Sequence, residues 1–207
     1  MKKIMFNDKF GLTEAVLNVK KTMTRRICKY DRPNENYEIV FPVFEPNEYD
    51  DDGNITSKLD RAFGWRDKEG NFTGWNIPQY RIGEVVAVAQ SYKVLYNDPL
   101  SMIGSNLKYS KGWNNKMFVR ADLMPHKIQI TDISIQKLQD ISNEDCLKEG
   151  INEATRDFPW YWYEYNNKKF IFNEPRQAFA ALIDKVSGKG TWDSNPYVFI
   201  YEFKLIK

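Results

Sequence analysis

A short basic segment near the N-terminus has the residue types best suited to bind a ligand. Between residues 20 and 29 there are five basic side chains and no acidic one: Lys20, Lys21, Arg25, Arg26 and Lys29. Two hydroxyls and a thiol are interleaved with these charges: Thr22, Thr24 and Cys28. A basic run is usually a solvated face. The interleaved hydroxyl groups favour a site for an anion or a polar ligand, with residues 20–26 as its centre.

The other candidate reactive residues give weaker signals. Cys28 and Cys146 form no CxxC motif, which favours free thiols in a reducing compartment. His126 is the only histidine, and no zinc spacing includes it, so we expect a structural role and no metal site. The acidic run at 50–52 lacks EF-hand spacing and is interpreted as a solvated turn. Phosphate-binding glycine loops and serine-hydrolase elbows have no match in a fitting context, and no cofactor is predicted.

Composition is that of an ordinary globular chain. The 207 residues are 42% hydrophobic and 28% charged, which suits one domain with a substantial core. The net charge of +2 is too small for the whole surface to attract nucleic acid. The sequence contains no apolar run of membrane-spanning length, and no secretory signal follows Lys2 and Lys3. We therefore expect a cytoplasmic protein with no membrane partner.

Two elements flank the basic segment. Leu12, Val16 and Val19 recur at helical spacing, with Thr13 as a cap, which predicts a short amphipathic helix over residues 13–20. The sequence KKTMTRRI follows directly, and its Thr and Ile content and lack of Gly and Pro are typical of a strand. The basic segment therefore begins at a helix-to-strand junction.

Strands are expected to outnumber helices. Alternating apolar and polar residues predict strands at 80–89, 116–123 and 127–135, and an aromatic strand is predicted at 197–206. The strands are too close together for βαβ crossovers throughout. The sequence therefore predicts an α+β fold with an antiparallel sheet or barrel.

Two further helices are expected in the second half of the chain. The first covers residues 143–149, between the capping Ser142 and Gly150. The second carries an apolar stripe that begins at Phe179 and ends before Gly188. The turn-rich residues 91–115 are interpreted as a loop excursion.

This order of elements resembles the ASCH domain family, which is related to PUA domains. The first helix, KKTMTRR, RIGEVVAV, IQITDISIQKLQDIS and YVFIYEFKLI carry the resemblance. Its most specific motif is the signature Gly-x-Lys-x-x-x-x-Arg, here residues 19–26, in which Val19 replaces the glycine. The resemblance implies a small PUA-like β-barrel, mostly antiparallel, with flanking short helices. A single domain would span residues 1–207, with insertions at about 30–79, 91–115 and 151–172, as in larger bacterial or phage-encoded members.

The resemblance also implies a ligand and a set of site residues. RNA-associated members suggest a cleft for RNA or a modified nucleoside, and small amidohydrolase members deacetylate N4-acetylcytidine. By motif position, the catalytic residues would be Lys21, Thr24 and Glu149. Further ligand-binding candidates are Lys20, Thr22, Arg25 and Arg26. Trp192, in a loop with Gly188 and Gly190, is a candidate stacking lid or a plug for the barrel end.

Three functions stay open on the sequence alone. The first is RNA or modified-nucleoside binding by a basic cleft around residues 20–26. The second is amide hydrolysis of N4-acetylcytidine or a related acylated base, which needs Lys21, Thr24 and Glu149 to converge on one cavity. Because residues 21 and 24 point to opposite faces of a regular strand, this function also needs a bend between them. The third is docking of an unidentified protein partner on the aromatic segment at 160–165.

Overall fold

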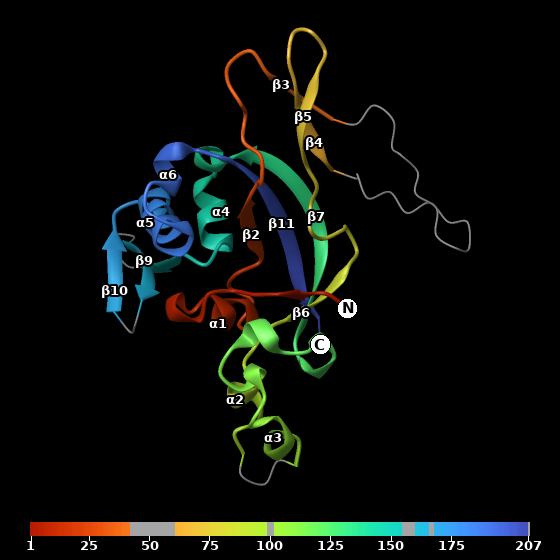
Figure 1. Ribbon diagram of the computed structural model, residues 1–207. Coiled ribbons are helices and arrows are strands. Elements are labelled where there is room, and N and C mark those ends of the chain that lie inside the picture. Colours follow the sequence, from red (N-terminus) through yellow and green to blue (C-terminus); the bar gives the residue numbers. More distant parts are fainter. Residues whose placement is uncertain (42–60, 99–101, 155–159, 166–167, 207) are drawn as a thin grey trace, which may run out of the picture.

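The computed structural model describes residues 1–41, 61–98, 102–154, 160–165 and 168–206. These residues form a mixed α+β structure with several antiparallel sheets and short helices (Figure 1). The predicted fold class, α+β with a mainly antiparallel arrangement, is confirmed at this level. The acidic run at 50–52 lies outside the described residues.

The largest sheet has five strands in the order β1-β6-β7-β11-β2. In chain order these strands are β1 (Lys3–Ile4), β2 (Met23–Ile27), β6 (Val85–Val88), β7 (Lys127–Lys137) and β11 (Tyr197–Ile206). β1 runs parallel to β6, and every other neighbouring pair is antiparallel. The ladder between β7 and β11 shifts register at Glu202/Phe203. Such an irregularity increases local twist, and both strands are visibly curved in Figure 1.

The predicted closed barrel is not formed by the strand pairings of the described residues. β1 and β2 are the two edges of the five-stranded sheet, and no ladder in the described part joins them. A side chain spans the gap: Nη2 of Arg26 on β2 donates a hydrogen bond to the main-chain oxygen of Met5, directly after β1, at 2.8 Å. The seam between β1 and β2 is therefore held by a side chain instead of a ladder.

One predicted strand is wrong. Residues 116–123 form two 3-10 turns, η3 (Lys116–Phe118) and η4 (Ala121–Leu123). The alternating apolar residues serve a different purpose there, because Val119 packs in a small separate cluster with Tyr92. The main-chain N–H of Arg120 also donates to the Tyr92 hydroxyl at 2.8 Å, which replaces a ladder hydrogen bond. Tertiary contacts thus override the strand pattern.

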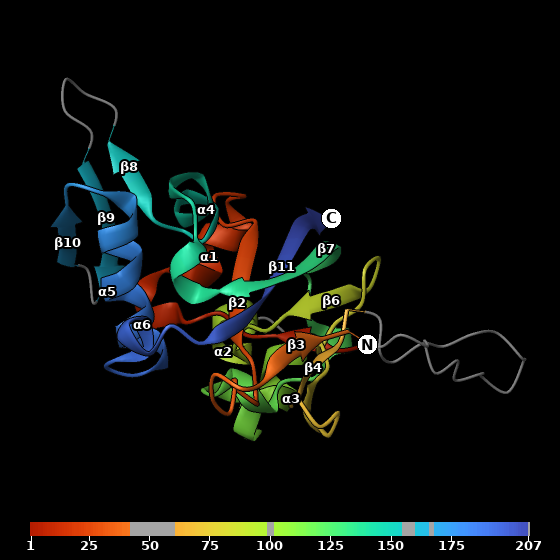
Figure 2. The ribbon, with the colours of Figure 1, turned by 90° about the horizontal axis from the view of Figure 1, so that it is seen from above.

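Four helices lie on one side of the five-stranded sheet or beside its edge (Figures 1 and 2). They are α1 (Leu12–Leu17), α4 (Asn143–Lys148), α5 (Pro175–Ser187) and α6 (Thr191–Ser194). α5 begins with Pro175, whose missing N–H costs nothing at a helix start. Its predicted apolar stripe is buried at Phe179, Leu182 and Ile183. The helix predicted before the basic segment is present as α1, but it covers Leu12–Leu17, and Thr13 lies inside it instead of capping it. The helix predicted after Ser142 is present as α4.

The three expected insertions carry secondary structure of their own. Residues 30–79 include a sheet of β3 (Glu38–Val40), β4 (Phe63–Arg66) and β5 (Phe72–Asn76). Residues 151–172 include a sheet of β8 (Asn152–Ala154), β9 (Trp160–Tyr165) and β10 (Lys168–Phe172). Residues 91–115 contain α2 (Tyr92–Tyr96), α3 (Met102–Leu107) and η2 (Lys111–Trp113), so the prediction of a loop was wrong.

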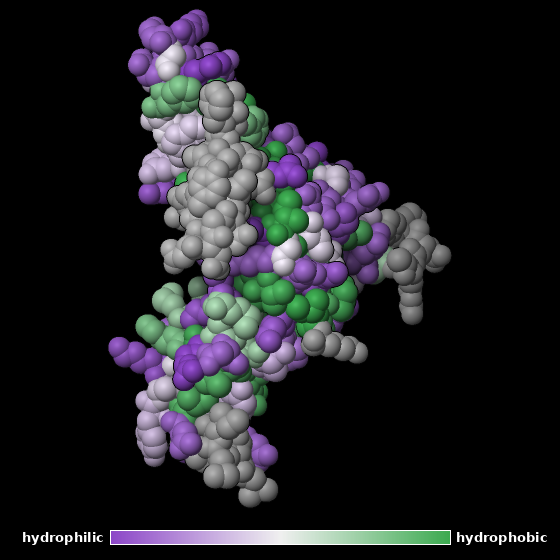
Figure 3. Space-filling model, turned by 90° about the vertical axis from the view of Figure 1, so that its right-hand side faces the viewer, coloured by the Kyte–Doolittle hydropathy of each residue, from purple (hydrophilic) through white to green (hydrophobic). Residues whose placement is uncertain are grey.

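Aromatic side chains join these parts to the main core. Phe63 packs at 5.6 Å from Phe199 of β11, measured between ring centroids. The short turn η1 (Asp8–Phe10) places Phe10 at 4.8 Å from Tyr165 of β9. The turn η5 (Leu138–Asp140) follows β7 and buries Leu138. On the face shown in Figure 3, apolar residues also reach the surface near the middle, among hydrophilic ones.

Candidate functional site

The chain enters the basic segment through a tight turn at the end of α1. The N–H of Lys20 donates to the oxygen of Ala15 at 2.8 Å, and the N–H of Val19 donates to the oxygen of Val16 at 3.0 Å. This pair of bonds is the Schellman motif, which needs a left-handed residue at its centre. Val19 takes that conformation, with φ of 58°. A left-handed turn of the kind that glycine favours therefore forms before Lys21, with valine at its centre.

A second Schellman turn ends α4 and faces the first. The N–H of Ile151 donates to the oxygen of Cys146 at 3.1 Å, and Gly150 has φ of 103°. A Cβ atom on Gly150 would lie 3.2 Å from Cδ2 of Leu12 and 3.6 Å from Cδ of Lys21. Glycine therefore allows the end of α4 to approach the junction between α1 and β2.

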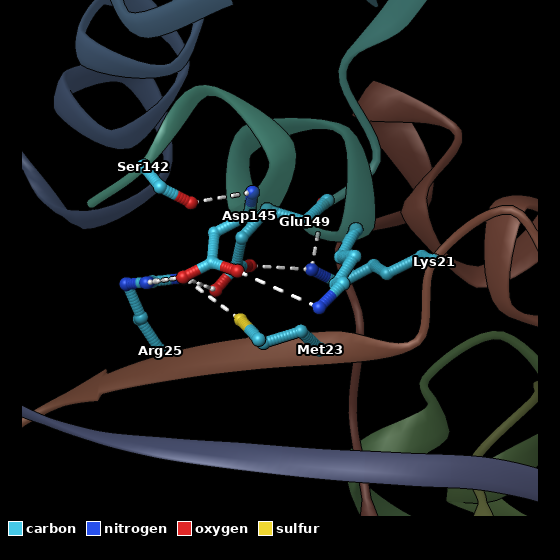
Figure 4. A network of polar contacts seen from close by, with 7 residues as sticks. Lys21, Met23, Arg25, Ser142, Asp145 and Glu149 are labelled. Carbon is cyan, nitrogen blue, oxygen red and sulfur yellow. Dashed lines mark hydrogen bonds and ion pairs between the residues drawn. The ribbon is translucent and has the colours of Figure 1, made fainter. Parts of the chain in front are cut away.

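Lys21 and Glu149 meet at this junction (Figure 4). Nζ of Lys21 donates to Oε2 of Glu149 at 2.6 Å and to its main-chain oxygen at 2.7 Å. The two side chains are only 2% and 6% exposed, so the ion pair is almost completely desolvated. The neighbouring carbonyl of Lys148 accepts from the N–H of Thr22 at 3.0 Å. Two free carbonyls at the end of α4 are thus satisfied by the segment that precedes β2.

Arg25 holds the other side of the same carboxylate. Its Nη1 lies 3.1 Å from Oε1 of Glu149, and its Nη2 lies 2.9 Å from Oδ2 of Asp145, one helical turn earlier on α4. With its amide oxygen turned toward the guanidinium, Gln136 of β7 accepts from Nη2 at 2.8 Å and from Nε at 3.3 Å. The Arg25 side chain is 1% exposed. Arg25 is therefore a buried clamp and is not a free surface cation.

The environment of Lys21 favours its neutral form more than water does. Burial lowers the pKa of Lys21 below its ordinary value of 10.5, because desolvation outweighs the opposing attraction of Glu149. The positive charges of Arg26 and Arg25 lower the pKa further. Nζ also lies 5.9 Å from the centre of the Phe6 ring, which adds apolar surroundings. A buried lysine with a lowered pKa is a typical general base.

Thr24 lines the same cleft as this ion pair. The cleft has a volume of about 880 Å³, and its walls include Lys21, Thr24, Arg25, Arg26 and Glu149. Thr24 is 5% exposed, and its hydroxyl makes none of the side-chain hydrogen bonds found among the described residues. Lys21 precedes the first residue of β2, so the alternation of a regular strand does not separate it from Thr24. Both side chains line the cleft, as the catalytic hypothesis requires.

The remaining walls come from the β1–β2 seam and from α5. Met5 and Phe6 line the cleft on the β1 side, and Arg26 and Ile27 line it on the β2 side. Four apolar residues of α5 form another wall: Phe179, Leu182, Ile183 and Val186. The cleft therefore combines a charged floor with one apolar side, as small-molecule sites commonly do.

Three predicted ligand-binding residues lie away from this cleft. Lys20 is exposed, Thr22 is half-buried, and neither belongs to the cleft walls. Trp192 is half-buried and packs against Phe179, with ring centroids 6.3 Å apart. Its position suits the packing role that the sequence left open. Arg26 and the buried Arg25 do line the cleft.

Two residues of the site were not predicted from the sequence. The first is Asp145, whose N–H donates to the capping Ser142 side chain at 3.1 Å. The Asp145 carboxylate, however, binds Arg25. Its spacing of four from Glu149 was the available signal, because residues four apart share one helix face. Gln136 offered no signal, since only the pairing of β7 with β11 brings it near Arg25.

The described residues contain no group of three or more His, Cys, Asp or Glu side chains placed to hold a metal ion. None of the helices in the described ranges has the length and apolar character needed to cross a membrane. Both cysteines are buried free thiols, and burial raises the pKa of each to about 12.

No family model matches the chain, and no curated protein or solved structure is significantly similar to it.

Proposed function

We propose that this chain is an ASCH-type amidohydrolase that removes an acyl group from a modified nucleoside of the N4-acetylcytidine type. The observation that carries the proposal is that Lys21, Thr24 and Glu149 line one cleft, with Nζ of Lys21 2.6 Å from Oε2 of Glu149. The same proposal treats the curved five-stranded sheet as a PUA-like barrel that is open at the β1–β2 seam.

The first half of the reaction transfers the acyl group to Thr24. Two of the three hydrogen positions on Nζ of Lys21 point to Glu149, so the remaining position can carry the lone pair of a neutral amine. That lone pair takes the proton of the Thr24 hydroxyl while the oxygen attacks the acyl carbon. The C–N bond breaks as the same proton passes to the leaving nitrogen, directly or through Glu149. Deacylated nucleoside and a Thr24 ester result.

The second half returns the enzyme to its starting state. A water molecule attacks the ester carbon, and Lys21 takes one of its protons. The bond from the acyl carbon to the Thr24 oxygen breaks, and the proton returns to that oxygen. The carboxylic acid then leaves. Over both halves, one amide and one water become one acid and one amine, with no oxidant or further reactant.

RNA binding is the second candidate, and Arg26 is the observation that favours it. Arg26 lines the cleft and has no carboxylate partner among the described residues. The cations at positions 21 and 25 are paired with Glu149 and Asp145, and Lys116, which also lines the cleft, is paired with Asp8. Because most cations of the cleft are paired with carboxylates, the cleft suits one polar group of a small ligand better than a polyanion.

The test is acetate release by purified protein from N4-acetylcytidine and a panel of related acylated nucleosides. We expect wild type to release acetate, Lys21→Ala to fall to the buffer rate, and Thr24→Ala to lose about 100-fold or more. Lys29→Gln removes a neighbouring cation outside the cleft and should react like wild type. No release from any nucleoside, together with RNA binding that weakens with salt and on Arg26→Gln, would support the binding function instead.

A further inference from the structure

Arg25 occupies a position that the Gly-x-Lys-x-x-x-x-Arg signature leaves open, yet it is one of the most buried charges in the site. All three guanidinium nitrogens have partners. Nη1 contacts Glu149, Nη2 contacts Asp145, and Nε lies within reach of Gln136. Such a fixed fork cannot rotate away to bind a ligand without leaving two carboxylates unpaired.

The two oxygens of Glu149 are divided between two cations. Oε1 is bound by Arg25 at 3.1 Å, and Oε2 is bound by Lys21 at 2.6 Å. Because Arg25 is itself fixed from β7 and from the first turn of α4, it determines the orientation of the Glu149 carboxylate plane. The carboxylate can then offer only Oε2 to Lys21.

We propose that Arg25 is a positioning residue of the candidate site: by holding Oε1 of Glu149, it directs Oε2 to Lys21 and balances the Glu149 charge. This inference rests on the proposed function, since it assigns Arg25 a task in the same reaction. Arg25 touches no reacting atom in this role.

The charge of Arg25 also affects the protonation of Lys21. Glu149, directly after α4, faces Lys21, as do Arg25 and Arg26 of β2, and Asp145 of α4 faces Arg25. Without Arg25, the Glu149 carboxylate would have Lys21 as its main partner and would hold the proton on the amine more strongly. With Arg25 in place, Lys21 can become neutral while Glu149 keeps a cationic partner.

A purely structural role is the competing explanation, because Arg25 also ties β2 to α4. Two substitutions separate the roles. Arg25→Gln removes the charge and the fork, whereas Asp145→Asn removes a negative charge and keeps an oxygen that can accept from Arg25. Lys29→Gln serves as a matched control, since Lys29 is exposed and lies outside the cleft.

The experiment is an NMR titration of the full chain labelled with ¹³C at lysine Cε, with the Lys21 signal assigned from Lys21→Arg. We expect Arg25→Gln to raise the pKa of Lys21 and Asp145→Asn to lower it, because the two variants remove charges of opposite sign. Lys29→Gln should leave the pKa unchanged. An unchanged Lys21 pKa in Arg25→Gln, or equal upward movement in both variants, would overturn the proposal.

Kinetics and a second variant complete the test. We expect Arg25→Gln to lower kcat for acetate release by about 10- to 100-fold, as loss of a supporting contact commonly does. If Arg25→Gln does not fold, Arg25→Lys retains the charge but lacks the fork; it should keep the lowered Lys21 pKa and still lose kcat. If the Lys21 pKa changes as expected in both variants but the wild-type protein releases no acetate, the amidohydrolase function is refuted. The positioning of Glu149 by Arg25 would still stand.

Discussion

At the scale of single residues, the site depends on charges that water does not reach. The Lys21 and Glu149 side chains are almost fully buried, and removing Glu149 would leave Lys21 without its carboxylate partner. Loss of one partner from such a pair typically costs about 3–5 kcal/mol. An activity assay of Lys21 or Glu149 variants therefore has to be accompanied by a stability measurement, so that lost chemistry is not confused with lost folding.

Val19 is the residue whose conformation fits its side chain least. A β-branched residue with φ of 58° is strained, by roughly 1–2 kcal/mol. We predict that Val19→Gly raises the free energy of unfolding by on the order of 0.5–1 kcal/mol, after the entropy that glycine gains in the unfolded chain. Urea unfolding followed by circular dichroism measures it. Val94→Gly is the control, because exposed Val94 lies within α2 and its substitution should destabilise. Equal destabilisation by both would contradict the prediction.

At the scale of elements, two helix ends build the site. α1 and α4 both end in left-handed turns, and the free carbonyls of α4 are satisfied by the backbone and side chains just before β2. A cation placed at a helix C-terminus is favoured by the helix dipole as well as by the hydrogen bond. The position of Lys21 thus follows from how α4 ends, and the contact between the two turns sets the geometry of the floor of the cleft.

Gly150 is the test of that contact. We predict that Gly150→Ala destabilises the protein by more than Gly70→Ala does, although both glycines have positive φ. The new methyl group would lie 3.2 Å from Leu12 at position 150, but it would meet nothing within 4 Å at position 70. Gly70→Ala therefore reports backbone strain alone, which is of order 1–3 kcal/mol. Thermal unfolding of the two variants compares them, and equal losses would show that the close approach carries no energy.

At the scale of the whole molecule, the candidate cleft lies beside the open seam between β1 and β2. A continuous ladder would have covered this edge, whereas Arg26 bridges it with a side chain and leaves a cleft beside the buried ion pair. Cys28 and Cys146 lie within the main core, and each thiol is protonated well above its ordinary pKa of 9.0.

Those thiols predict how stability changes at high pH. Between about pH 9 and pH 12 the unfolded chain loses thiol protons that the folded chain keeps, so the unfolded state binds fewer protons and stability falls as pH rises. We expect the urea midpoint to fall between pH 8 and pH 10.5, and to fall less in Cys28→Ala/Cys146→Ala. Tyr201, whose pKa burial raises to about 12, contributes the same sign in both proteins. An identical pH dependence in the two proteins would contradict burial of the thiols.

The sequence by itself determined the α+β class and the helix-to-strand junction, and it named Lys21, Thr24 and Arg26, which line the candidate cleft. These features depend on local periodicity, capping and residue type, which neighbouring positions specify. It did not predict that residues 116–123 form 3-10 turns, because their apolar alternation is explained only by packing against Tyr92. Nor did it identify Gln136, whose role depends on the pairing of distant strands.

Only the tertiary structure determined which charges of the basic segment are buried and which carboxylates they pair with. In the sequence, Lys21 and Arg25 have the same solvated appearance as Lys20 and Lys29. In the folded chain they are buried against Glu149, which is 128 residues from Lys21. The physical reason is that the sequence of a segment gives only the number of its cations. Their burial and ion pairing depend on which helix end packs against that segment.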